Sequence, residues 1–193
     1  MPRILAFAGS ARRDSLNKKL ARVAADGALA AGGQVTLIDL NDYALPVYHG
    51  DLEAAEGMPE NARKLRELFL AHDALLIASP ENNSSVSSLL KNTIDWLSRD
   101  IGDGKGDNSG YAPFHGKLAA MLGASPGAFG TVRAMPHLRQ ILSALGVTVL
   151  ATQVPVPRAD KVFDAAGAIT DERVARAVKG LAAALVEAAR KLA

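Results

Sequence analysis

Short apolar runs alternate with longer amphipathic segments along the chain, and this alternation limits the possible folds more than any other feature. The apolar runs have the length and composition of buried strands, and they cover residues 4–8, 34–40, 74–78, 117–123 and 147–154. Amphipathic segments with the spacing of helices separate or follow them. Parallel strands joined by helices form right-handed crossovers. The sequence therefore predicts an α/β fold with three layers, in which five helices cover a five-stranded parallel sheet.

Two segments have neither pattern. Residues 41–57 are predicted to form a long connection, and the glycine- and aspartate-rich stretch from Asp100 to His115 is predicted to form an irregular loop. Ordered loops of such length are uncommon in compact domains unless they are functional or mobile. We therefore expect the second segment to act as a lid or as an oligomer contact.

Polar loops follow the first, third and fourth predicted strands, at residues 9–17, 79–85 and 124–130. In open parallel sheets, ligands bind beyond the carboxyl ends of the strands, where the strand order reverses. With the strand order 2-1-3-4-5, these three strands are neighbours. The three loops are then expected to converge on one crevice.

The first polar loop has the composition of a phosphate-binding loop. It connects a strand to the N-terminus of a helix, where unpaired backbone N–H groups and the positive end of the helix dipole attract anions. Ser10, Ser15 and Asn17 can donate hydrogen bonds, and Arg12 can add charge-assisted ones. The alternative is a solvated loop in which Ser15 is an ordinary helix N-cap.

The third polar loop matches the G-x-S-x-G pattern of hydrolases, with Ser125 in the place of the nucleophile. However, the following residue is Pro126, which has no N–H group for an oxyanion hole. His137 is the single histidine after this loop. We therefore favour a glycine-rich loop that lets a flat ligand approach the backbone, and keep a Ser125 hydrolase as an alternative.

Composition excludes several classes of protein. The length of 193 residues fits one domain, residues 1–193, and the net charge of +2 comes without a basic, aromatic-rich block for nucleic acid. The absence of cysteine excludes disulfides and thiolate chemistry, and the four histidines lack metal-site spacing. No run is long enough for a signal peptide core or a membrane span. We expect a cytoplasmic protein without a metal.

The polar loops and their flanking residues also carry a family resemblance. The matching residues are Gly9-Ser10-x-Arg12-x-x-Ser15-x-Asn17, residues 79–85 followed by Leu90-Lys91-Asn92-x-Ile94-Asp95-Trp96, Gly116-Lys117, and Gly123-Ala124-Ser125-x-Gly127-x-x-Gly130 with Arg133. With these motifs, the chain resembles the NAD(P)H-dependent FMN reductases of the flavodoxin-like fold, which include quinone, azo-dye and chromate reductases. The resemblance runs nearly from end to end.

The resemblance implies a cofactor, a reaction and a set of binding residues. NAD(P)H would give a hydride to bound FMN, which would pass electrons to a small acceptor: a quinone, an azo compound, a metal oxyanion or free flavin. FMN would carry the redox chemistry, so no catalytic side chain is expected. The FMN phosphate would be bound by Ser10, Arg12, Ser15 and Asn17, the ring by Pro80, Glu81, Asn82, Asn83 and Ser85, and the other end of the ring by Ser125 and Gly127. Members of the family are usually homodimers or homotetramers.

Two positions depart from the family pattern. Asn82 stands where the family commonly has tyrosine, and Ser84 stands where it commonly has glycine. An alternative hypothesis is that the chain is a flavodoxin-type electron carrier rather than an enzyme. Such carriers are typically strongly acidic, and the sequence pI near 9.0 argues against this hypothesis.

Overall fold

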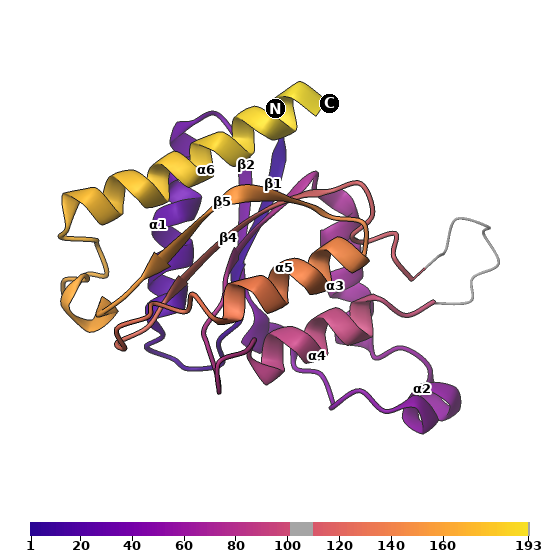
Figure 1. The fold of residues 1–193 in the computed structure, drawn as a ribbon. Coiled ribbons are helices and arrows are strands. Elements are labelled where there is room, and N and C mark those ends of the chain that lie inside the picture. Colours follow the sequence, from indigo (N-terminus) through magenta and orange to yellow (C-terminus); the bar gives the residue numbers. More distant parts are fainter. Residues whose placement is uncertain (101–109, 193) are drawn as a thin grey trace.

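The computed structural model describes residues 1–100 and 110–192. Its centre is a parallel sheet with the strand order β2-β1-β3-β4-β5, which confirms the predicted order (Figure 1). The strands are β1 (Arg3–Ala8), β2 (Gln34–Asp39), β3 (Ala74–Ala78), β4 (Leu118–Ala124) and β5 (Thr148–Val156). The predicted strands are therefore all present, with β5 extending two residues further than expected.

Helices cover both faces of the sheet and form the predicted three layers (Figure 1). The helices α1 (Leu16–Ala30) and α6 (Glu172–Leu192) pack together on one face. The opposite face carries α3 (Glu60–Ala71), α4 (Ser88–Leu97) and α5 (Ala134–Ala144). Two short 3₁₀ helices, η1 (Leu40–Tyr43) and η2 (Ala159–Lys161), follow β2 and β5.

The alternation of side chains along β1 divides the interior into two cores. Ile4 and Ala6 are fully buried against α1 and α6, whereas Leu5 and Phe7 are buried with residues of α3, α4 and α5. The ring centroid of Phe7 lies 5.5 Å from that of Phe69 on α3. Burial on both faces explains why β1, β3 and β4 are continuous apolar runs in the sequence.

The predicted connection at residues 41–57 contains a short helix, α2 (Gly50–Glu56), so this expectation was wrong in part. Sequence periodicity did not reveal the helix because α2 buries none of its residues. Instead, the segment before it is held by Trp96, whose indole N–H donates to the carbonyl of Pro46 at 2.8 Å. Trp96 is fully buried and packs edge-on against Tyr48.

The loop predicted from Asp100 to His115 falls mainly on residues 101–109, which lie outside the described part of the chain. Of its described residues, Phe114 is fully buried, and its ring packs edge-on against Phe69. Within the described residues, no helix is long and apolar enough to cross a membrane.

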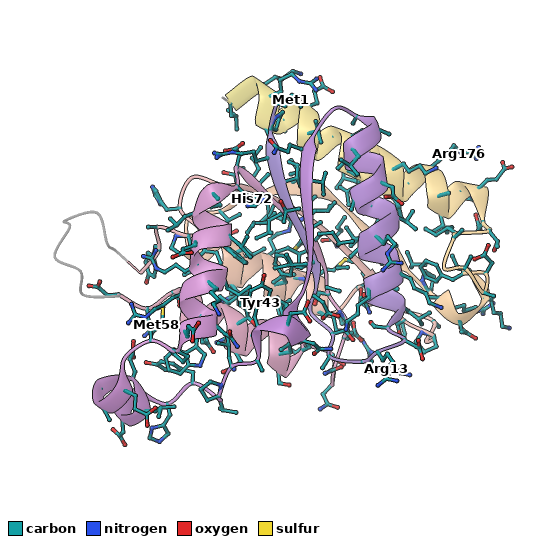
Figure 2. All side chains as sticks on the ribbon, turned by 180° about the vertical axis from the view of Figure 1, so that it is seen from behind. Met1, Arg13, Tyr43, Met58, His72 and Arg176 are labelled. Atoms are coloured by element: carbon teal, nitrogen blue, oxygen red, sulfur yellow. The ribbon has the colours of Figure 1, made fainter. Side chains whose placement is uncertain are left out.

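The two edges of the parallel sheet lie at opposite ends of the molecule. Figure 2 shows Met1, which precedes β1, at one end and Arg13, which follows β1, at the other. Because all five strands run in the same direction, the loops after β1, β3 and β4 leave the sheet at the edge where Arg13 lies. This carboxyl edge holds the candidate site.

Candidate functional site

A cavity of about 320 Å³ opens at the carboxyl edge of the sheet, between the loops that follow β1, β3 and β4. This volume lies at the lower end of the range for small-molecule sites. The lining residues are Gly9, Ser10, Ala11, Arg12, Ser15, Leu16, Asn17, Pro80, Glu81, Asn82, Ser87, Ser88, Leu89, Ala124, Ser125 and Pro126. The predicted convergence of the three polar loops is therefore confirmed.

The backbone of the first loop lies directly against α4. A Cβ atom on Gly9 would lie 2.8 Å from the Cβ atom of Leu90, so a larger residue would push the loop and the helix apart. The hydroxyl of Ser87 donates to the Gly9 carbonyl at 2.6 Å and also accepts from the N–H group of Leu90, as the N-cap of α4. These contacts fix the turn with its backbone facing the cavity.

The first loop presents unused hydrogen-bond donors to the cavity. Among the described residues, the backbone N–H groups of Ser10, Ala11 and Arg12 have no acceptor, and neither does the guanidinium of Arg12. These groups lie before the N-terminus of α1, where the helix dipole adds positive potential. A set of unpaired N–H donors beside a cation suits an anionic ligand.

Ser15 is the N-cap of α1, and this role is compatible with ligand binding. Its Oγ atom accepts from the N–H groups of Asn17 and Lys18 at 3.2 and 3.4 Å. A hydroxyl that accepts hydrogen bonds keeps its own proton for donation. Ser15 lines the cavity, so that proton has a ligand within its reach.

Asn17 connects the first loop to the third. Its Nδ2 atom donates to the carbonyl of Ala124, and its Oδ1 atom accepts from the N–H group of Ala124, both at 2.9 Å. Asn17 and Ala124 are each 4% exposed. The amide thereby fixes the spacing between two walls of the cavity, and one of its N–H groups remains for a ligand.

Glu81 connects the second loop to the N-terminus of α5. Its carboxylate accepts from the backbone N–H groups of Arg133 and Ala134 at 3.0 and 3.1 Å, and from Nε of Arg133 at 2.7 Å. Desolvation raises the pKa of Glu81, but the hydrogen bonds from Arg133 and Ala134 outweigh it and hold the pKa below its ordinary value. The carboxylate therefore stays ionised and caps α5.

The tip of the second loop is a tight hairpin closed by Asn82 and Ser85. Each of these residues donates its backbone N–H group to the carbonyl of the other, at 3.0 and 2.9 Å. Between them, Asn83 and Ser84 have φ values of +49° and +63°. Two successive residues in the left-handed region are typical of a type I′ turn. Asn82 lines the cavity, whereas the turn residues Asn83 and Ser84 do not.

The third loop is held by close packing and by bonds to the segment after β5. A Cβ atom on Gly123 would lie 2.0 Å from Oγ1 of Thr131, so no other residue fits there. The Ser125 hydroxyl accepts from the N–H group of Gly127 at 3.1 Å. His137 contacts Ser85 rather than Ser125. Within the described residues, this loop therefore lacks the serine–histidine contact that a hydrolase needs.

Eight of the predicted site residues line one cavity, and three do not. The lining residues are Ser10, Arg12, Ser15, Asn17, Pro80, Glu81, Asn82 and Ser125, whereas Asn83, Ser85 and Gly127 lie outside it. Sequence reasoning missed Ser87, which lines the cavity and caps α4. A serine directly before an apolar helical stretch is the N-cap signal that would have identified it.

Comparisons with known proteins agree on one family. The family model described as NADPH-dependent FMN reductase matches residues 2–161. An NAD(P)H-dependent FMN reductase of Pseudomonas aeruginosa is 40% identical over 172 residues, which are 89% of this chain and 86% of that protein. A 2-hydroxy-1,4-benzoquinone reductase of a Burkholderia species is 33% identical over 171 residues, 88% of this chain and 86% of that protein. The solved structure of FerB, a flavoenzyme NAD(P)H:(acceptor) oxidoreductase from Paracoccus denitrificans, matches with a TM-score of 0.79 and 31% identity, covering 99% of this chain and 98% of that chain.

Proposed function

Because the chain belongs to the NADPH-dependent FMN reductase family, we propose that it passes electrons from NAD(P)H through FMN to a quinone. The chain is an enzyme of the NAD(P)H-dependent FMN reductase and quinone reductase type, with a flavodoxin-like fold and with FMN and NAD(P)H as its cofactors. The choice of a quinone among the possible acceptors is our proposal. It is supported by the Burkholderia relative, which is named for a hydroxyquinone.

The donor set of the cavity fits FMN, and this observation carries the proposal. A phosphate monoester offers acceptor oxygens to the unpaired N–H groups of the first loop, to the guanidinium of Arg12 and to the hydroxyls of Ser10 and Ser15. Beside it, the backbone of Pro80, Glu81 and Asn82 forms a wall for a flat ring, and Ser125 lies across the cavity. We propose these residues as the FMN site. Asn17 holds the first loop and the third loop together through its hydrogen bonds to Ala124.

When bound, FMN supplies the hydride chemistry between NAD(P)H and the acceptor. The residues of the chain bind and orient it: the first loop fixes the phosphate, and the second loop limits access of water to the ring. Glu81 acts on the site through α5, because its carboxylate holds the helix N-terminus against the second loop. Three further residues stay proposed contacts of the ring although they do not line the cavity: Asn83, Ser85 and Gly127.

Steady-state turnover by the purified protein tests the proposal. Protein loaded with FMN is mixed with NADPH or NADH and a benzoquinone, and loss of the reduced nicotinamide is followed by absorbance. We expect continuous oxidation that requires both FMN and the quinone. Reduction of FMN without turnover would instead indicate a flavodoxin-type carrier, and absence of any reaction with FMN would contradict the assignment.

We also propose that the enzyme acts in the cytoplasm as a homodimer or homotetramer. The absence of cysteine suits a reducing compartment. The short helix α2 buries none of its own residues and extends away from the three layers in Figure 1, which suits a contact with a second copy. Sedimentation of the FMN-loaded protein measures the assembly, and a monomer at micromolar concentration would contradict this part of the proposal.

A further inference from the structure

A serine and a histidine are hydrogen-bonded to each other beside the cavity, and neither of them is among its lining residues. Oγ of Ser85, in the hairpin after β3, lies 2.9 Å from Nδ1 of His137 on α5. Their partners fix both residues next to the cavity wall. Ser85 is paired with the lining residue Asn82 by two backbone hydrogen bonds, and α5 is attached to the lining residue Glu81 by its first N–H groups.

The imidazole of His137 is free to exchange protons with water. His137 is exposed, and its Nε2 atom has no hydrogen-bond partner among the described residues. The charged groups on the packed elements are engaged elsewhere: Arg133 pairs with Glu81, Arg139 donates to carbonyls of β5, and on α4 Lys91 pairs with Asp95. Among the described residues of these elements, no carboxylate therefore forms a hydrogen bond with His137.

Reduction of a quinone needs a proton as well as a hydride. Addition of a hydride gives a hydroquinone anion, and one proton on the remaining oxygen completes the product. Histidine is the side chain that changes charge near neutral pH, which makes it suited to such a transfer. A hydroxyl held by Nδ1 can relay the proton, since it accepts from the imidazolium while it donates to the substrate.

We propose that Ser85 and His137 deliver this proton to the quinone, an inference that rests on the proposed function. The O–H bond of Ser85 breaks as a new O–H bond forms on the quinone oxygen, and Nδ1–H of the His137 imidazolium replaces the serine proton. His137 is then neutral with its remaining proton on Nε2, and it regains the lost proton from water at Nδ1. Ser85 is the catalytic residue in this step, and His137 acts through it.

A comparison of two acceptors tests the proposal, because ferricyanide takes electrons without a proton. In His137→Gln, the amide keeps a hydrogen bond to Ser85 but supplies no proton. We expect quinone turnover to fall by about 100-fold, the lower limit for general acid catalysis, while ferricyanide turnover and FMN affinity stay unchanged. His115→Gln, on the opposite edge of the sheet, is the matched control and keeps both activities. Equal losses with both acceptors, or no loss with quinone, would overturn the proposal.

Proton coupling within the pair is measured separately, without turnover. Nitrogen NMR spectra of the oxidised, FMN-loaded protein at one fixed pH report the hydrogen bonding of the ring nitrogens of His137 and His115. We expect Ser85→Ala to shift the Nδ1 resonance of His137 and to leave the resonances of His115 in place; an unchanged Nδ1 resonance of His137 would contradict the relay. If the wild-type protein reduces neither acceptor, the proposed function fails instead, and the NMR experiment still decides whether the pair is coupled.

Discussion

Ser84 adopts a backbone conformation that glycine tolerates better, with φ at +63° in the second loop. A non-glycine residue pays about 1–2 kcal/mol in this region, and glycine loses more freedom on folding by about 0.4–1 kcal/mol. We therefore predict that Ser84→Gly raises the free energy of unfolding by about 0.5–1 kcal/mol. Urea denaturation measures the change. Ser143→Gly, the same substitution inside α5, is the control and is expected to lower stability; loss of stability in both variants would contradict the argument.

Arg12 is the cation of the phosphate loop, and it has no partner in the described protein. We predict that Arg12→Ala weakens FMN binding by about 1.5–3 kcal/mol, the range for a hydrogen bond to a charged group. Quenching of flavin fluorescence measures the dissociation constant. Arg176→Ala, on the surface of α6, serves as the control for loss of positive charge. Equal affinity for FMN in the Arg12 and Arg176 variants would count against the phosphate assignment.

At the level of single residues, the sequence predicted most of the residues that line the cavity. It did not predict the hydrogen bonds between residues that lie far apart in the chain. Ser10, Arg12 and Ser15 line the cavity as expected because strand–loop–helix junctions have a fixed local geometry, and their contact with the FMN phosphate stays a prediction. The bonds of Glu81 to Arg133 join residues 52 positions apart. The Ser85–His137 contact spans the same separation. Such contacts depend on how α5 lies against the second loop, which no local pattern contains.

The N-terminus of α5 is stabilised by an ionised Glu81. Because the folded pKa lies below the ordinary 4.5, the unfolded state binds more protons near that pH, and stability falls as pH falls through this window. We predict that Glu81→Gln lowers the free energy of unfolding by about 1–2 kcal/mol at neutral pH. The difference from wild type shrinks in acid, where the glutamate is protonated. Denaturation curves without FMN at both pH values check this, and a constant difference would contradict it.

The junction of α1 and β4 depends on Asn17. Asn17→Ala would leave the N–H and C=O groups of Ala124 without partners in a buried position. Each unsatisfied group costs about 1–3 kcal/mol, so for the two groups we predict a loss of about 2–6 kcal/mol of unfolding free energy. Asn61→Ala, which removes an exposed bond to the Ala44 carbonyl, is the matched control with a smaller effect. An equal loss of unfolding free energy in the two variants, measured by urea denaturation, would contradict this role of Asn17.

At the level of elements, long amphipathic helices were predictable and the short one was not. The faces of α3, α5 and α6 pack against the cores, so their apolar spacing is visible in the sequence. In α2, Leu52 is only partly buried against the small cluster that contains Trp96, and the preceding segment is held by hydrogen bonds from Trp96 and Asn92 of α4. The helix α4 begins at Ser88, and Val86 packs on the core before the helix starts.

For the whole molecule, the fold and the place of the site followed from one argument. Five apolar runs joined by helices allow few sheet topologies, and parallel strands bring their following loops to one edge. The structure confirms both points, with the cavity between the loops after β1, β3 and β4. The number of domains, the role of the segment from Asp100 to His115 and the oligomeric state remain predictions, because no described contact tests them.

The central claim is that the cavity recognises FMN through its phosphate, and binding of FMN and riboflavin tests it most directly. The two flavins share the ring and differ in the phosphate group. If the first loop binds the phosphate with at least two charged hydrogen bonds, riboflavin should bind at least about 100-fold more weakly than FMN. Fluorescence titration of the cofactor-free protein measures both constants. Equal affinity for the two flavins, or no binding of FMN, would contradict the account.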